Sequence, residues 1–273
     1  VTPLIKHDLI HAKMEHVCNL GALIADDIAT DAQCKAFIAD PEVVNEFIPE
    51  SRYTGIPDIH RRSIFHALNS KAVARKYAKE HNTRYEDLNL IMVHLGGGIS
   101  VGAHRKGKVI DVNNALNGDG PISPERAGTL PSLQLAEMCF SGKFTLPQIK
   151  KLICGCGGMA AHLGVTDMRQ VMPHAEAGEQ PYAEVVSAMA YTIAKEIGSR
   201  AVALHGDVDA IIYTGGIAYN KYFTDLISSW VKWIGPIVLM PGEDEMGSLA
   251  TNALGALNGT LPMQTYAPND ADD

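Results

Sequence analysis

The sequence has no apolar run that approaches the ~18–20 residues of a membrane-spanning helix. It is also poor in basic residues, with 23 Lys and Arg against 31 Asp and Glu and a formal net charge of −8. This acidic balance argues against a nucleic-acid-binding surface and against attachment to an anionic membrane. A ligand that carries phosphate would therefore need cations gathered locally or a bound metal ion.

Cysteine is scarce as well, with five in a chain of 273 residues. An odd number of cysteines argues against a disulfide framework. Cys154 and Cys156 stand closer together than the C-x-x-C spacing of the usual metal-binding or redox pair. We therefore expect all five cysteines to be reduced and the protein to be cytoplasmic. The chain starts at Val1 without a methionine, and we expect the sequence to begin inside a longer protein.

The central stretch predicts a strand, a glycine loop and a hairpin. An apolar run at 90–93 is followed by the glycine loop, Gly96–Gly98. Two further β-like runs, at 99–104 and 109–112, are separated by a short basic turn. The composition, 46% hydrophobic and 20% charged, suits a soluble globular protein of one large or two ordinary domains.

The glycine loop admits two interpretations. Glycine leaves room for another molecule to approach the backbone, and N–H groups that converge in such a loop form an anion site, which favours a phosphate cradle. The same residues would also serve a tight turn that needs glycine for geometry alone. The loop does not match G-x-x-x-x-G-K-[ST], and it does not open a helix as a dinucleotide-binding motif does. By itself the loop leaves both interpretations open.

A second apolar strand followed by glycines occurs later in the chain. Ala210–Thr214 is predicted as a buried strand, and Gly215–Ile217 lead into a helix predicted over 221–233. A third strand, predicted over 237–240, leads to the acidic residues Glu243–Glu245, which begin another helix. Acidic residues in a first turn suit the helix dipole, so this cluster could be only a cap. The repeated arrangement predicts a two-lobed α/β nucleotide fold.

Three single side chains are candidates for chemistry. Asp40 follows a short strand predicted over 35–39, where open α/β folds place ligands, although Asp-Pro is also a common turn. His66 lies in the first turn of a helix predicted over 63–80, where a lone histidine is more often structural. Arg126 is flanked by prolines and a glycine, which favours a rigid loop that holds its guanidinium against an oxyanion.

Helical patterns predict most of the remaining elements. Residues 5–28 predict a helix with a break near Asn19, on which His16 and Asn19 lie one turn apart, either lining a site or forming a polar edge. Ser63 is predicted to cap the helix over 63–80. Further helices are predicted over 132–140, 146–153 and 181–205.

Three motifs together resemble those of the butyrate kinases: His94–His104, Asp111–Leu116 and Pro124–Pro131. Butyrate kinases belong to the acetate kinase branch of the fold that acetate kinases share with sugar kinases and actin. The likeness extends from Val1 to about Leu257. It implies an α/β protein with the two-lobed acetate kinase/actin-like (ribonuclease H-like) fold and a truncated first lobe.

The resemblance also implies how the chain is divided. Family members begin with a strand and an Asn-Pro-Gly-Ser-Thr-Ser phosphate loop, and neither stands before Val1 in this sequence. Residues 1–41 would then be a remnant of the first lobe, and 42–241 would form the second lobe, on the nucleotide side. Residues 242–273 would form a helix that returns to the first lobe, followed by a flexible tail.

The reaction that the resemblance implies is Mg²⁺-assisted phosphoryl transfer to a short-chain carboxylate, ATP + butanoate = ADP + butanoyl phosphate. Acetate, propionate or a branched acid are alternative substrates, and an inactive, truncated nucleotide-binding fragment is the alternative from another class. The resemblance further implies a homo-oligomer, whereas the acidic charge balance predicts neither a nucleic acid nor a membrane as partner.

Residue by residue, the resemblance assigns three kinds of role. Catalytic roles fall on Asp40, His66 and Arg126, where the arginine neutralises charge on the transferring phosphoryl group and the histidine donates a hydrogen bond to it. Phosphate and nucleotide contacts fall on His94, Gly96, Gly97, Gly98, Thr166, Asp167, Arg169, Gly215, Gly216 and Ile217. Contacts to the metal fall on Glu243 and Glu245.

Overall fold

The computed structural model describes residues 1–12, 18–116 and 119–267. The chain divides into two compact units: the first combines Val1–Pro41 with Glu245–Asp273, and the second runs from Glu42 to Asp244. His16, a candidate from the sequence, lies outside the described residues.

The described part of the first unit is built from the helices α1 (Pro3–Ile10), α2 (Cys18–Asp31) and α10 (Glu245–Leu257). Thr2 caps α1, because its hydroxyl oxygen accepts a hydrogen bond from the N–H of Ile5 at 3.4 Å. Lys6 of α1 pairs with Asp26 of α2 at 2.6 Å, which holds these two helices side by side.

Two predictions for the first unit are wrong. The break predicted near Asn19 in the helix over 5–28 is misplaced: α1 ends at Ile10, and α2 continues through Asn19 and Gly21, because one glycine costs a helix only about 1 kcal/mol, which neighbouring helix formers offset. The segment 35–39 is not a strand of any sheet in the described residues, since an extended segment needs a paired neighbour to form a ladder. Asp40, directly after it, has a left-handed φ of +38°.

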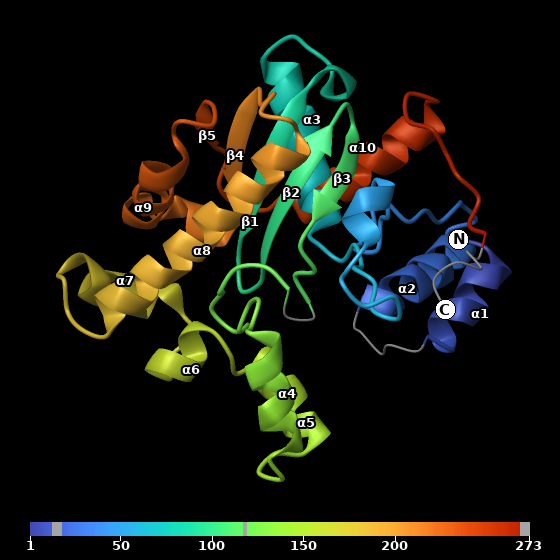
Figure 1. Cartoon of the computed structure of the whole chain (residues 1–273). Helices are drawn as coiled ribbons and strands as arrows, with labels where there is room; N and C mark the ends of the chain where they lie inside the picture. The colour runs from blue at the N-terminus through green and yellow to red at the C-terminus, as the bar shows by residue number, and fades with distance from the viewer. Residues whose placement is uncertain (13–17, 117–118, 268–273) are drawn as a thin grey trace. The chain divides into compact units, whose positions relative to one another are not determined.

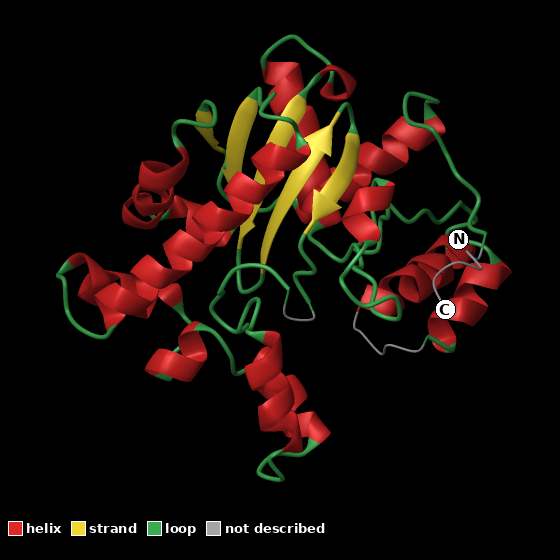
Figure 2. Ribbon diagram, in the orientation of Figure 1, coloured by secondary structure: helices red, strands yellow, loops and turns green. Residues whose placement is uncertain are grey.

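The second unit contains a five-stranded sheet in the order β3-β2-β1-β4-β5 (Figure 2). Its strands are β1 (Asn89–Leu95), β2 (Ile99–Arg105), β3 (Lys108–Val112), β4 (Ala210–Thr214) and β5 (Ile237–Leu239). The first three are antiparallel neighbours joined by short turns, as the sequence predicts. β4 and β5 run parallel to β1, so long helical connections must return the chain to the sheet.

The helices described in the second unit are α3 (Ala67–Glu80), α4 (Ser132–Phe140), α5 (Leu146–Ile153), α6 (Met159–Leu163), α7 (Met168–Glu176), α8 (Tyr182–Ala203) and α9 (Lys221–Val231). Single 3-10 turns lie at Pro49–Arg52, Tyr85–Asp87 and Gly216–Tyr219. The predictions for α4, α5 and α8 are confirmed. The start predicted for α3 is wrong: the helix begins at Ala67, because the Ser63 hydroxyl donates to the carbonyl of Val44 instead of capping a helix.

The two faces of the sheet pack against different helices (Figure 1). Ile91 and Val93 of β1 belong to the larger core, which contains residues of α7, α8 and α9. Leu90 and Met92 point to the opposite face and pack against residues of α3. Because side chains alternate along a strand, His94 lies on the same face as Met92, the face that α3 covers.

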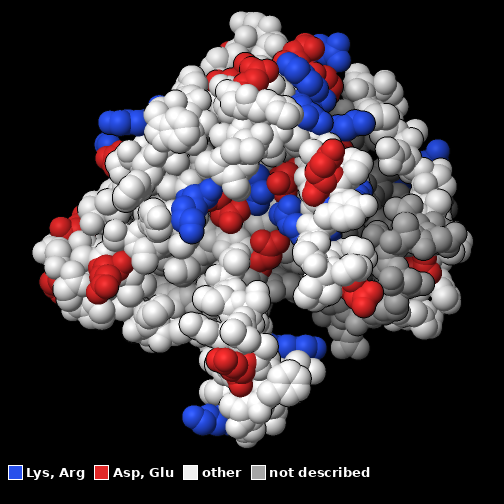
Figure 3. Space-filling model, in the orientation of Figure 1, with Lys and Arg blue, Asp and Glu red and all other residues white. Residues whose placement is uncertain are grey.

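A buried arginine fastens α8 across the sheet. Arg200 is 4% exposed, donates from Nε to the carbonyl of Val101 at 2.9 Å and pairs with Asp111 at 2.8 Å. Asp111 also accepts from Arg61 at 2.8 Å, so its charge is shared between two guanidinium groups. In Figure 3 basic and acidic side chains are interspersed on the face of the second unit that α8 crosses.

Candidate active site

A row of polar side chains crosses the sheet near the end of β1. Ser100 of β2 and Thr214 of β4 are the direct register partners of His94. All three side chains are buried, with exposed fractions of 2% or less. Buried polar groups require hydrogen-bond partners, and those partners must come from the helix that covers this face.

The N-terminal end of α3 supplies the partners. Ser100 Oγ lies 2.7 Å from Nδ1 of His66 and 3.3 Å from its backbone nitrogen. Asn69 Oδ1 lies 2.9 Å from Nδ1 of His94 and 3.3 Å from Oγ1 of Thr214. The rings of His66 and His94 stack with centroids 3.8 Å apart and planes inclined by 7°. We call these five residues the histidine cluster.

The surroundings of His66 keep its imidazole neutral. Burial, together with the nearby His94 and Arg126, lowers the pKa of His66 from its ordinary 6.5 to about 2. Ser100 Oγ accepts from the backbone N–H of His66, so the hydroxyl proton is available to Nδ1 of the ring. When the hydroxyl donates to Nδ1, the single ring proton lies on Nε2, and His66 is a neutral hydrogen-bond donor at that atom.

The glycine loop lies in direct contact with the two candidate groups. A Cβ at Gly96 would lie 3.0 Å from Nε2 of His94, and a Cβ at Gly98 would lie 1.8 Å from Nη1 of Arg126. The N–H of Gly96 donates to the carbonyl of Gly98 at 3.2 Å, which closes the turn. A backbone without side chains therefore lets the histidine edge and the guanidinium meet at one loop.

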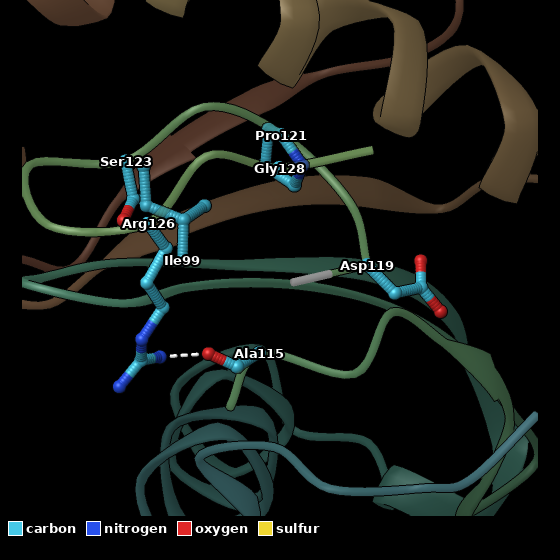
Figure 4. Close-up of a pocket in the computed structure, with 7 residues that line it drawn as sticks. All are labelled: Ile99, Ala115, Asp119, Pro121, Ser123, Arg126 and Gly128. Carbon is cyan, nitrogen blue, oxygen red and sulfur yellow. Dashed lines mark hydrogen bonds between the residues drawn. The ribbon is translucent and has the colours of Figure 1, made fainter. Parts of the chain in front are cut away.

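Arg126 reaches the glycine loop from the long connection between β3 and α4. Its guanidinium donates from Nη1 to the carbonyl of Ala115 (Figure 4). Ser123 of the same connection donates from Oγ to the carbonyl of Gly97 at 2.8 Å. The connection and β2 form a small hollow, which is lined by Ile99, Ala115, Asp119, Pro121, Ser123, Arg126 and Gly128 (Figure 4).

A glycine-rich segment after α5 holds the connection that carries Arg126. Cys154 and Arg126 form an antiparallel bridge. Gly158 has a φ of +62°, and a Cβ there would lie 2.0 Å from the carbonyl oxygen of Ser123, so a larger residue would displace the backbone. Contacts between backbones therefore fix the position from which the guanidinium extends.

The turn after β4 brings an acidic side chain to His94. Gly215 has a φ of +86° and approaches β1 so closely that a Cβ would lie 2.5 Å from the carbonyl oxygen of Leu95. Two backbone hydrogen bonds join Gly215 to Gly242, the residue before Glu243. Oε1 of Glu243 lies 3.2 Å from Nε2 of His94. Hydrogen bonds from His94 and from the Gly216 N–H hold the pKa of the Glu243 carboxyl below its usual range.

Several other predicted site residues stand at the N-terminus of α7 or belong to the first unit. Asp167 caps α7, accepts from the N–H of Arg169 at 2.9 Å and pairs with its guanidinium, which lowers the pKa of Asp167 to about 2. The Arg169 side chain is 91% exposed, and the nucleotide contacts of Thr166, Asp167 and Arg169 stay predictions. Asp40 and Glu245 belong to the first unit, and their roles stay predictions as well.

The exposure of Glu243 indicates whether its carboxylate could bind a metal ion. Its carboxylate is 40% exposed, and a solvent-accessible oxygen ligand suits Mg²⁺, which usually keeps several waters. The described residues contain no group of three or more His, Cys, Asp or Glu placed to hold a metal ion, so a metal here would draw most of its ligands from water and phosphate. In the same described part of the chain, no helix has the length and apolarity needed to cross a membrane.

Reasoning from the sequence missed the roles of Asn69 and Thr214. Both are ordinary polar residues in predicted elements, and their contacts depend on which strands are neighbours. One signal was present: Thr214 ends an apolar strand directly before glycines, much as His94 interrupts the apolar run before the first glycine loop. Polar residues at two such strand ends mark one edge of a parallel sheet.

Comparison with known proteins identifies the family. Residues 48–234, which include His66, His94, Arg126 and the glycine loop, match the model of the acetokinase family. This chain belongs to the acetokinase family. The acetokinase is 64% identical over 264 residues to a probable butyrate kinase from Phocaeicola vulgatus, across 97% of this chain and 75% of that protein. It is 51% identical over 267 residues to a probable butyrate kinase from Bacteroides thetaiotaomicron, across 97% of this chain and 76% of that protein.

Solved structures confirm the predicted fold class of the acetokinase. The crystal structure of Porphyromonas gingivalis acetate kinase superposes with a TM-score of 0.82 at 18% identity, across 94% of this chain and 73% of that one. Entamoeba histolytica acetate kinase superposes with a TM-score of 0.77 at 17% identity, across 93% of this chain and 75% of that one. The chain therefore has the α/β fold of the acetate kinase and actin group.

Proposed function

We propose that this acetokinase transfers the γ-phosphoryl group of ATP to a short-chain carboxylate, with butanoate as the preferred acid: ATP + butanoate = ADP + butanoyl phosphate. One observation carries the proposal. The stacked rings of His66 and His94 and the guanidinium of Arg126 meet at the glycine loop, in a chain that is 64% identical to a probable butyrate kinase. Such a set of donors around bare backbone suits a transferring phosphoryl group.

Phosphoryl transfer asks the protein mainly for positioning and for neutralisation of charge. A carboxylate is already a nucleophile, so no strong general base is needed. In this proposal the backbone of Gly96–Gly98 lies against the phosphate oxygens, and Arg126 neutralises the charge that develops on the equatorial oxygens. The Nε2–H of His66 donates to the same oxygens, and His94 presents its Nε2 edge beside the loop.

Magnesium, when bound, would reduce the negative charge of the nucleotide phosphates. We assign Glu243 and Glu245 as the carboxylates that hold it, directly or through water, with Asp40 as a further catalytic carboxylate. The accessible oxygen of Glu243 beside His94 supports this assignment. The roles of Glu245 and Asp40 are supported by the resemblance to the family.

We assign the nucleoside of ATP to two segments. The first is the turn after β4, Gly215–Ile217, where a Cβ at Gly216 would meet no atom within 4 Å, so that a ribose or base has room to approach. The second is the N-terminus of α7, with Thr166, Asp167 and Arg169, which the resemblance supports.

The test is ATP-dependent formation of an acyl phosphate, trapped as the hydroxamate, with butanoate, isobutanoate, propanoate and acetate in separate reactions. We expect the highest kcat/KM with butanoate. Because one methylene is worth only ~1–3 kcal/mol in a binding pocket, the neighbouring acids should retain measurable rates. A higher kcat/KM for another acid would move the assignment to that acid. The kinase assignment itself is wrong if none of the four acids gives an acyl phosphate.

We also propose that the protein assembles as a homo-oligomer, as the resemblance to the family implies. The chain has a mass of 29.4 kDa, so light scattering of the purified protein at working concentration should give a multiple of that value. The mass of a single chain would contradict this part of the proposal.

A further inference from the structure

We propose that Asn69 is a positioning residue for the phosphoryl transfer. Its side-chain carbonyl accepts a hydrogen bond from Nδ1 of His94, fixes the rotation of that imidazole and so turns its Nε2 edge toward the glycine loop. The inference rests on the proposed kinase function and adds to it a residue that neither the resemblance nor the sequence motifs assign.

The stacking of the two histidine rings does not by itself fix which edge of the His94 ring faces the glycine loop. Parallel rings 3.8 Å apart fix the plane of each imidazole, but a flip of 180° about the Cβ–Cγ bond keeps that plane and remains possible. Such a flip would exchange the nitrogen and carbon atoms at the edge beside Gly96. A hydrogen bond to one ring nitrogen removes this freedom, and for His94 the bond to Asn69 is 2.9 Å long.

Asn69 is itself held in place from the sheet. Its side chain is 5% exposed, and Oγ1 of Thr214 lies 3.3 Å from its Oδ1. Thr214 Oγ1 also lies 3.1 Å from the carbonyl oxygen of Gly242, directly before Glu243. The side chain that orients His94 is therefore tied to β4 and to the turn that carries the acidic group.

The two rings of the stack have separate partners on opposite strands. Ser100 of β2 contacts Nδ1 of His66, whereas Asn69, supported by Thr214 of β4, contacts Nδ1 of His94. Each ring thus has a partner at Nδ1 that orients it, and Nε2 of His94 faces Glu243. This symmetry is the reason to regard Asn69 as part of the catalytic arrangement and not as a filler of the core.

The experiment compares three variants. Asn69→Leu keeps the approximate size without the acceptor, Asn69→Asp keeps the acceptor, and Asn89→Leu is the matched control. Asn89 is also 5% exposed and lies at the other end of β1. We expect Asn69→Leu to lower kcat by about 10–100-fold, as misplacement of a catalytic group does, with little change in KM for ATP. Asn69→Asp should recover most of the loss, and Asn89→Leu should leave kcat unchanged.

A second readout does not depend on activity. Nitrogen chemical shifts of the His94 ring in the ligand-free protein should show a protonated, hydrogen-bonded Nδ1 in the wild type and lose that signature in Asn69→Leu. Unchanged shifts together with unchanged kcat in Asn69→Leu would overturn the proposal. So would equal losses of kcat in the Leu and Asp variants, or a similar loss in Asn89→Leu. A wild-type protein that phosphorylates no carboxylate would overturn the proposed function instead, while the shifts would still decide the role of Asn69.

Discussion

The sheet face that α3 covers buries a histidine at each end, and the two ends differ. Near the carboxyl end of β1, both ring nitrogens of His94 have partners, Asn69 and Glu243. Toward the amino end, Nδ1 of His104 lies 2.7 Å from the Tyr85 hydroxyl, but Nε2 has no hydrogen-bond partner among the described residues. The polar groups at the first end form a connected cluster that includes an acidic side chain, whereas at the second end His104 pairs with a tyrosine hydroxyl.

Burial has the same electrostatic effect at both ends. It lowers the pKa of His104 to about 3, as it lowers the pKa of His66 to about 2. The partners of Nε2 are what differ, because Nε2 of His94 faces the half-exposed Glu243, whereas Nε2 of His104 has no hydrogen-bond partner among the described residues. A buried histidine alone therefore does not mark a site, but one beside a glycine loop and a guanidinium does.

The largest effect is expected from Arg126→Ala. Loss of the guanidinium should cost on the order of 3 kcal/mol or more in transition-state stabilisation, seen as a fall in kcat/KM. The matched substitution toward the amino end of β1, His104→Phe, should leave kcat/KM unchanged. Steady-state kinetics of both variants with ATP and butanoate provide the measurement. Unchanged turnover in Arg126→Ala would contradict the role given to the site near the carboxyl end of β1.

A pair of glycine substitutions, one directly before β2 and one inside it, sharpens the comparison. A Cβ at Gly98 would displace the guanidinium of Arg126, the mobile end of a long side chain, so Gly98→Ala should lower kcat by about 10–100-fold with little loss of stability. A Cβ at Gly102 would lie 3.2 Å from Nε2 of His104, so Gly102→Ala should lower stability by about 1–3 kcal/mol and spare kcat. Equal effects of the two variants on kcat would show that the ends do not differ.

A change of pH tests whether His66 and His104, the buried histidines at the two ends, both have a lowered pKa. Because the folded pKa values of His66 and His104 lie below 6.5, the folded state binds fewer protons than the unfolded state at acidic pH. Their contribution to stability is complete above pH 6.5 and is lost as pH falls toward the folded values. Between pH 7.5 and 5.5 each histidine should remove about 1.4 kcal/mol from the free energy of unfolding. Urea unfolding at the two pH values measures this loss, and in His104→Phe about half of the histidine contribution should disappear.

The smallest effect is expected from Tyr85→Phe. The variant removes the partner of His104 Nδ1 and should cost about 1 kcal/mol of stability without changing kcat. Ser100→Ala removes the corresponding partner of His66, and it should lower both stability and kcat. Thermal unfolding and kinetics of this pair would show whether a hydroxyl–histidine bond has a catalytic consequence at one end alone. A loss of kcat in Tyr85→Phe would contradict the comparison.

Reasoning from the sequence located most of the elements because their patterns are local. One can recognise the apolar runs of β1, β2, β4 and β5 and the periodicity of α8 from the sequence, without knowing which elements they pack against. The start of α3 and the strand predicted over 35–39 were placed wrongly, because each depends on a partner elsewhere in the chain. Ser63 is engaged by the carbonyl of Val44, and a single extended segment forms no ladder.

The sequence by itself determined the family, the glycine loop and the identities of His66, His94 and Arg126, since these follow from motifs of adjacent residues. Only the tertiary structure decided which groups meet. Asn69 and Thr214 are 145 residues apart, and they come into contact because β4 pairs in parallel with β1 beneath the end of α3. Strand pairing across such a separation depends on the burial of both sheet faces, which a local pattern does not encode.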